Sequence, residues 1–137
     1  MPRPNASPLP SATWTMIVGD ADLARNLPIG VSAEVPPVLA TSRMILLMEF
    51  AAAACLAPVL DEGELSVGLR VDVHHTAATL AGVTVIATAR YLGKEGKRYL
   101  FEVTASDPAG EIGSGRHERG IIDEHRLLAG AERRQGS

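Results

Sequence analysis

The chain has 137 residues, 46% of them hydrophobic, so it is long enough for one domain with a proper core and too short for two. Its formal net charge is −3 and no basic cluster is longer than Arg133-Arg134, which argues against nucleic-acid binding because phosphates need a basic face. A single cysteine, Cys55, excludes an internal disulfide and fits a reducing compartment. No apolar signal-peptide stretch opens the chain, so we expect a soluble, cytoplasmic protein.

The first part of the chain is predicted to hold little regular structure. Residues 1–13 carry four prolines among polar residues and predict a flexible arm ahead of one domain over residues 14–128. Residues 14–18 predict a first strand. Residues 20–37 mix charged residues with prolines and a glycine, which indicates a loop with at most a short helical turn.

Residues 44–60 predict a long apolar helix in which Glu49 is the only charged residue. Thr41 or Ser42 is expected to be its N-cap, and Pro58 marks its end. A helix that is apolar on every side is expected to be enclosed by protein, since an amphipathic surface helix would keep a polar face. The stretch is the only membrane candidate, but it is slightly short and contains a glutamate, so a core helix is favoured.

After Gly63 the hydrophobic pattern changes to a period of two, which predicts strands with one buried face. Short turns separate these strands, so neighbouring strands are expected to be antiparallel. A polar tail over residues 129–137 is expected to follow the domain. The four predicted strands are centred on residues 65–73, 83–91, 99–105 and 112–122.

A single sheet with one apolar face can bury an apolar helix by curling around it. These elements therefore predict an α+β hot-dog fold, in which a curved antiparallel sheet of about five strands wraps around one long buried helix. The sheet edges and one helix flank would remain uncovered, and a homodimer would close both.

The lone carboxylate of Glu49 is the first candidate functional group. In an apolar helix it must lose water and raise its pKa, or find a proton, a cation or a ligand. The alternative is a structural role, in which Glu49 reaches solvent or pairs with an arginine from another element.

His75 has the same strand parity as Val71 and Val73, so a regular strand would direct it towards the helix that holds Glu49. A bulge before His75 would reverse this and put His74 in its place. An isolated histidine is usually a satisfied structural side chain, but a histidine facing a buried carboxylate can move protons for a substrate between them.

Thr41 could be a plain N-cap, or its hydroxyl and the free N–H groups of the helix start could contact an oxyanion. Eight residues separate Thr41 from Glu49, which is roughly 12 Å along a helix, so the two cannot easily share one substrate atom. We hypothesise that one site draws residues from two subunits, or that the chain bends sharply at Thr41.

Other chemistry-bearing residues are weaker candidates. Gly68 interrupts a strand and indicates a bulge or a close approach of a ligand to the backbone. Cys55 has the surroundings of an inert core thiol. Residues 117–119, His-Glu-Arg, could reach the site, pair across the sheet or lie on a solvated face. No spacing indicates a zinc site, a phosphate loop or a nucleophile elbow, so no metal is expected.

Several segments together resemble the fluoroacetyl-CoA thioesterase family of hot-dog proteins. The resemblance covers about residues 14–127. It is carried by the following residues: Val38-Leu-Ala-Thr41, Glu49, Ser66-Val-Gly68, Val71-Asp-Val-His-His75, Ala77-Ala-Thr79, His117-Glu-Arg119 and Ile122-Asp123.

The resemblance implies a homodimer that hydrolyses a short acyl-CoA, with Thr41, Glu49 and His75 as its catalytic set. Glu49 would be nucleophile or general base, His75 would move the proton, and Thr41 would orient the carboxylate or oxyanion. Gly68 would lie near the thioester carbonyl, and we assign Arg119 to substrate binding. Coenzyme A would enter only as part of the substrate, with no separate cofactor.

This chain departs from the family it resembles in one respect. The fluoroacetate-resistance enzymes look to carry phenylalanines in the loop before the helix, as a lid over the acyl group, whereas residues 29–37 here contain no aromatic residue. We therefore expect a different acyl group. A non-hydrolytic acyl-thioester binding protein is the main alternative, and a hydratase or dehydratase on the same fold is the next.

Overall fold

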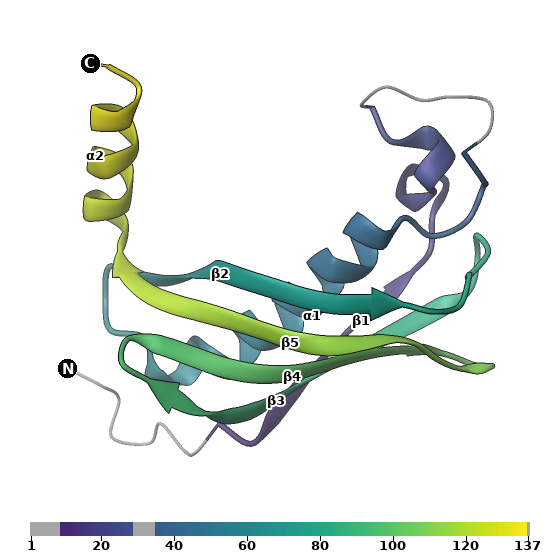
Figure 1. The fold of residues 1–137 in the computed structure, drawn as a ribbon, viewed down its shortest axis with the longest axis horizontal. Helices are drawn as coiled ribbons and strands as arrows, with labels where there is room; N and C mark the ends of the chain where they lie inside the picture. Colours follow the sequence, from purple (N-terminus) through teal and green to yellow (C-terminus); the bar gives the residue numbers. More distant parts are fainter. Residues whose placement is uncertain (1–8, 29–34, 137) are drawn as a thin grey trace.

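The computed structural model describes residues 9–28 and 35–136 of the chain. The strands form one antiparallel sheet in the order β1-β3-β4-β5-β2, and α1 lies on its concave face (Figure 1). This arrangement confirms the predicted hot-dog fold. The elements are β1 (Ser11–Ile17), α1 (Thr41–Leu56), β2 (Glu64–His75), β3 (Thr84–Glu95), β4 (Arg98–Asp107), β5 (Gly110–Asp123) and α2 (Glu124–Arg134), with 3-10 turns at Asp20–Asp22, Ala24–Asn26 and Ala57–Val59.

The core lies between α1 and the central strands. Most of the predicted inward positions of β3 and β4 are completely buried, among them Val85, Phe101 and Val103, whereas Tyr91 and Tyr99 are only partly buried. Burying such side chains contributes about 1.5–3 kcal/mol each, so this contact holds the domain together. Residues 41–59 are long and apolar enough to cross a membrane by length and composition, but a core helix passes the same test. The helix residues that pack on the sheet are Met44, Leu47, Met48, Ala51, Ala52, Cys55 and Leu56.

The expectation that α1 is enclosed on every side is wrong for the described chain. Phe50 is 45% exposed, and the side chain of Glu49 is 31% exposed. The sheet curls around only one flank of the helix, so apolar residues on the other flank remain uncovered. The long strand beside that flank, β2, is an edge of the sheet.

A bulge in β2 corrects the predicted alternation of that strand. The register shifts between Gly68 and Arg70, so the strand parity reverses there. His75 pairs with Gly113 of β5, and Val71 pairs with His117. These four residues lie on the face of the sheet that is turned towards α1. The predicted row from Leu65 to Val73 is therefore split between the two faces, and its member Leu69 is 53% exposed. The bulge that Gly68 predicted is present, and because it precedes residue 71 it leaves His75 facing inward.

Regular structure extends beyond both predicted ends of the domain. Strand β1 begins at Ser11, which pairs with Arg90, so residues 11–13 belong to the sheet. Residues 1–8 of the predicted arm lie outside the described residues. The predicted tail is helical to Arg134, because Asp123 caps α2 by accepting a hydrogen bond from the Arg126 backbone N–H. Arg133 and Arg134 in its last turn complement the helix dipole.

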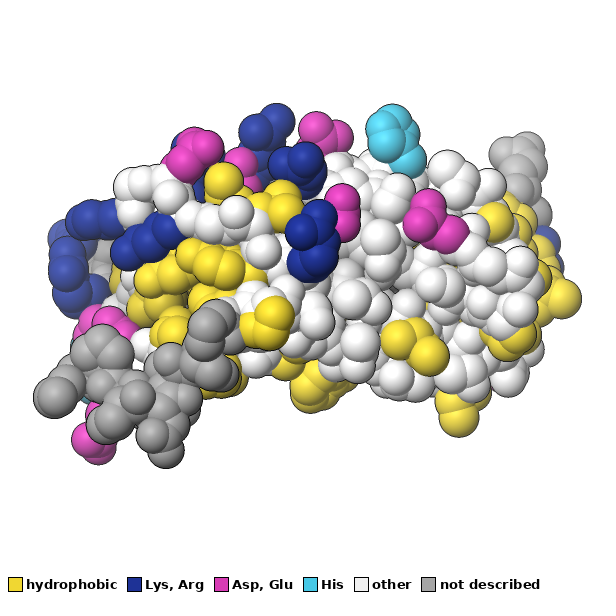
Figure 2. Space-filling model, turned by 90° about the horizontal axis from the view of Figure 1, so that it is seen from below, with side chains coloured by type: hydrophobic (Ala, Val, Ile, Leu, Met, Phe, Trp, Pro, Cys, Tyr) yellow, Lys and Arg dark blue, Asp and Glu magenta, His cyan; other side chains and the backbone are white. Residues whose placement is uncertain are grey.

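The outer face of the sheet is charged. Acidic and basic side chains gather along the upper margin of Figure 2, which is the side of the molecule that faces the viewer in Figure 1. Glu118 forms ion pairs there with Arg70 of β2 and Arg98 of β4. The chemistry-bearing side chains that face α1 therefore lie on the opposite side of the sheet from this solvated surface.

Gly115 provides a test of how tightly β2 and β5 approach each other. A Cβ at this position would overlap the carbonyl oxygen of Asp72 and the backbone of Val73, neither of which can move without displacing the strand. We expect Gly115→Ala to lower the free energy of unfolding by at least about 2 kcal/mol, measured by urea denaturation. Ser114→Ala is the matched control on the same strand, and an unchanged Gly115→Ala midpoint would contradict this packing.

Candidate functional site

Thr41 and His75 form the first polar pair of the candidate site. Thr41 Oγ1 lies 2.7 Å from Nδ1 of His75, which joins the first turn of α1 to the end of β2. The predicted N-cap role is therefore wrong: the N-cap residue is Ala40, and no side chain caps the helix. With Nδ1 unprotonated, the threonine hydroxyl donates to it, so the histidine is positioned to take a proton from that hydroxyl.

The Thr41–His75 pair opens into a cavity of about 350 Å³. Nε2 of His75 is buried and has no hydrogen-bond partner among the described residues. A buried polar atom without a partner is costly, so this nitrogen is free to bind a group that enters the cavity. The cavity is lined by Ala24, Pro36, Val38, Leu39, Thr41, His75, Thr76, Ala77 and Ala78.

Glu49 and Arg119 form the second polar pair. Arg119 Nη1 lies 3.5 Å from Glu49 Oε2, and the arginine side chain is 8% exposed. The pairing with an arginine from another element, which the sequence left open for Glu49, is therefore present. Gly68 completes this cluster: a Cβ there would lie 2.5 Å from Glu49 Oε2, so a side chain would push the carboxylate from its present place.

Further hydrogen bonds hold the guanidinium of Arg119. Nε donates to the Ser66 hydroxyl at 3.0 Å, and Nη2 donates to the Ser66 carbonyl at 3.0 Å. Nη1 lies 3.1 Å from Nε2 of the buried His117. Burial lowers the pKa of Arg119, and the nearby Glu49 carboxylate raises it. Such a fixed guanidinium is suited to holding a carboxylate or a developing oxyanion.

The five predicted site residues therefore fall into two groups. Thr41 with His75 lies at the start of α1, whereas Glu49 with Gly68 and Arg119 lies two turns further along the same helix. Because α1 is continuous from Thr41 to Leu56, the sharp bend that would bring the two groups together is absent.

The sequence left the placement of residues 117–119 open, and the structure divides them. His117 and Arg119 are 1% and 7% exposed and face α1, while Glu118 pairs across the outer face. The contribution of Ser66 was missed. A sequence signal for it does exist. Ser66 and Gly68 are two residues apart, as are His117 and Arg119 on the paired strand, and residues two apart on a strand lie on the same face of the sheet.

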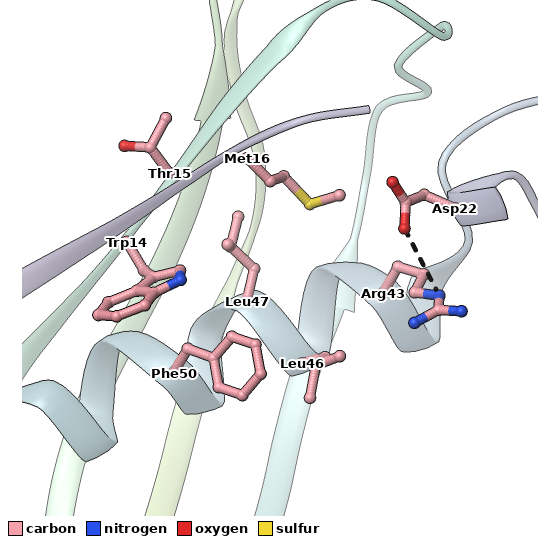
Figure 3. Close-up of a pocket in the computed structure, with 8 residues that line it drawn as sticks. All are labelled: Trp14, Thr15, Met16, Asp22, Arg43, Leu46, Leu47 and Phe50. Atoms are coloured by element: carbon pink, nitrogen blue, oxygen red, sulfur yellow. Dashed lines mark ion pairs between the residues drawn. The ribbon is translucent and has the colours of Figure 1, made fainter. Parts of the chain in front are cut away.

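A separate apolar cavity of about 160 Å³ lies between β1 and the exposed flank of α1 (Figure 3). The rings of Trp14 and Phe50 lie 5.9 Å apart at its edge, and Arg43 pairs with Asp22 at the other end. None of the five predicted site residues lines it, and its only charged side chains neutralise each other. Among the described residues, no group of three His, Cys, Asp or Glu side chains could hold a metal ion.

Comparison with known proteins identifies one family. A family model described as fluoroacetyl-CoA-specific thioesterase matches residues 18–125. A curated fluoroacetyl-CoA thioesterase from Streptantibioticus cattleyicolor is 49% identical over 90 residues. That match covers 66% of this chain and 65% of the relative, so the chain spans just under two thirds of that relative's length.

Several solved structures are similar to this chain over a larger share of its length. A threonine-to-alanine variant of the fluoroacetyl-CoA thioesterase FlK, in complex with fluoroacetate, is 38% identical with a TM-score of 0.85, over 90% of this chain and 95% of that one. A phenylalanine-to-alanine FlK variant with fluoroacetate and CoA is 40% identical with a TM-score of 0.81, over 85% and 95%. A Thermus thermophilus protein described as a thioesterase superfamily member is 32% identical with a TM-score of 0.82, over 93% and 94%.

Cys55 is the remaining nucleophile in the core, and its environment makes it inert. Burial raises the pKa of its thiol, and Sγ lies 3.5 Å from the Leu9 carbonyl oxygen. Since the thiolate is the reactive form, we expect no reaction with an aromatic disulfide reagent at pH 8 until denaturant unfolds the chain. Absorbance of the released thiol measures this, and rapid labelling of the folded protein would contradict the assignment.

Proposed function

The chain belongs to the fluoroacetyl-CoA-specific thioesterase family, and on that basis we propose that it hydrolyses the thioester of a small acyl-CoA. The observation that carries the proposal is the 2.7 Å contact between Thr41 Oγ1 and His75 Nδ1 beside a cavity. A thiolate leaves readily, so hydrolysis needs a positioned proton carrier and a group that stabilises the oxyanion more than it needs a strong nucleophile.

The two polar pairs supply these parts. His75 moves the proton, and Thr41 orients the reacting carboxylate or oxyanion. Glu49 attacks the carbonyl carbon or takes a proton from the attacking water, while Arg119 and the backbone at Gly68 hold the acyl group. Overall the C–S bond breaks, water adds hydroxyl to the acyl carbon, and the sulfur leaves with a proton as coenzyme A. No separate cofactor is needed in this scheme.

The scheme implies a homodimer, which would bring the two pairs together. Edge strand β2 has an unpaired side, and its inward residue Val71 is 40% exposed beside it. His75 at one end of β2 contacts Thr41, and Gly68 in its middle adjoins Glu49. Antiparallel pairing of two β2 strands about an axis between Gly68 and His75 would place the first pair of one copy beside the second pair of the other.

The acyl group is proposed to differ from fluoroacetyl. The segment that precedes α1 has no aromatic residue over 29–37, so it has no aromatic side chain to cover an acyl group. Residues 29–34 of this segment lie outside the described residues. The described part of the cavity is lined by small and aliphatic side chains together with Thr41 and His75, which suits a small acyl chain. A single cysteine agrees with work in the reducing cytoplasm.

The direct test is thiol release from acetyl-, propionyl-, butyryl-, phenylacetyl- and fluoroacetyl-CoA. We expect turnover of at least one substrate other than fluoroacetyl-CoA. Glu49→Gln should lower kcat by at least about a hundredfold, because it removes the negative charge while keeping the shape. Sedimentation and circular dichroism should show an unchanged folded dimer. Tight acyl-CoA binding without turnover would instead support the non-hydrolytic alternative, and loss of folding would make Glu49 structural.

Mixed dimers test whether the site is shared. Thr41→Ala and Glu49→Ala each remove one pair, so each homodimer should be inactive. After subunit exchange, half of the dimers are mixed and each has one intact site, so activity should recover to about a quarter of the wild-type value. Refolding each variant alone is the control. Absence of recovery, with exchange proved by mass spectrometry, would show that both residues act within one copy.

A further inference from the structure

We propose that His117 is a positioning residue, which in its neutral form holds the Arg119 guanidinium against Glu49 and is itself anchored by the β2 bulge. Three contacts carry this inference. His117 Nδ1 lies 2.8 Å from the Arg70 carbonyl oxygen, His117 Nε2 lies 3.1 Å from Arg119 Nη1, and that Nη1 lies 3.5 Å from Glu49 Oε2. They form one chain of contacts from the edge strand to the helix.

The partners of His117 determine which ring nitrogen carries the proton. A backbone carbonyl can only accept, so Nδ1 of His117 must be the donor to Arg70. A guanidinium can only donate, so Nε2 must be the acceptor for Arg119. A protonated ring has no acceptor nitrogen. The contacts are therefore compatible only with a neutral His117 that carries its hydrogen on Nδ1.

The anchor exists because of the bulge. The register shift lies between Gly68 and Arg70, directly opposite the stretch of β5 that holds His117 and Arg119. The same irregularity brings the glycine next to Glu49 and the Arg70 carbonyl next to the imidazole. One local feature of β2 thus positions both the carboxylate and the support of its arginine.

Nη1 is the guanidinium nitrogen that His117 binds, because Nε and Nη2 of Arg119 are bound by Ser66. One Nη1 hydrogen points to His117 Nε2, which leaves the other for Glu49 or for a bound acyl group. Without the acceptor at His117, an Nη1 hydrogen in this buried place would have no partner, and the guanidinium would be held by Ser66 alone.

Charge favours the same state of His117. Burial lowers its pKa first, and the Arg119 charge lowers it further, whereas the Arg70 carbonyl, Glu49 and Glu118 raise it. Because the folded pKa lies below that of the unfolded chain, the neutral ring persists to a lower pH than in the unfolded chain. The hydrogen bond between Arg119 and His117 is lost only as the pH falls through the pKa of His117 in the folded chain.

Two amide substitutions separate the two contacts of the ring. In His117→Gln the new amide oxygen would lie near the former Nε2 and can accept from Arg119, whereas in His117→Asn the new amide nitrogen would lie near the former Nδ1 and can serve only Arg70. This part of the test rests on the proposed thioesterase function. We expect His117→Asn to lower kcat/KM by about ten- to a hundredfold, as expected for a lost hydrogen bond to a charged group, and His117→Gln to stay within a fewfold of wild type.

Arg116→Gln is the matched control, since Arg116 is an exposed neighbour on the same strand. The part of the acid limb of the kcat/KM profile that His117 contributes should also be lost in His117→Gln, while the part due to the groups that react should remain, which a purely structural role would not produce. Equal losses in the two amide variants, or a harmless His117→Asn, would overturn the proposal.

Nitrogen-15 spectroscopy of the imidazole rings tests the proposal without any reaction. At pH 7 the wild-type His117 ring should show a protonated Nδ1 and an unprotonated Nε2. Its signals are assigned by their absence in His117→Gln or, if that variant fails to fold, through the covalent bonds that join the ring to the backbone. A ring protonated on Nε2, or on both nitrogens, would overturn the proposal even if the enzyme is active. If no acyl-CoA is turned over, the proposed function fails, and this measurement still decides the state of His117.

Discussion

The close approach of α1 to β2 at Gly68 is the constraint on which the rest of the structure depends. A side chain at this position would occupy the space of a Glu49 carboxylate oxygen, so the glycine lets the carboxylate lie where it does between helix and strand. The bulge that follows the glycine turns the end of the strand so that His75 faces the helix start. The same contact brings the carboxylate within 3.5 Å of Arg119. The contact between α1 and β2 at Gly68 therefore relates the position of the Thr41–His75 pair to that of the Glu49–Arg119 pair.

The two pairs are held apart by a continuous helix, and this separation is the reason for proposing that a second copy completes the set of groups. Thr41 and Glu49 are separated by two turns of α1, and packing against a buried sheet leaves the helix no freedom to bend. Val71 on the β2 edge and Phe50 on the outer flank of α1 are among the exposed apolar side chains. The proposed homodimer would cover the β2 edge and bring further groups near Nε2 of His75, which has no hydrogen-bond partner among the described residues.

Most of the fold could be predicted because local patterns determined it. An apolar run with one charge predicts a core helix, and period-two alternation over β3 and β4 placed their buried residues correctly. The errors occur where a tertiary contact overrides a local preference. Thr41 has the side chain of an N-cap, but its hydroxyl bonds to His75 instead. The β2 alternation predicts one apolar face, yet the bulge divides it between two faces.

The sequence by itself determined which residue types are available for chemistry: a lone acid in an apolar helix, a histidine of inward parity, and a glycine that interrupts a strand. Tertiary structure alone decided which of them meet. A sequence pattern reports the direction of a side chain within its own element, whereas contacts between elements depend on register and on the space left by neighbours. Thus Glu49 meets Arg119, and His117 meets both Arg119 and the Arg70 carbonyl, because β5 pairs with a bulged β2 in one register.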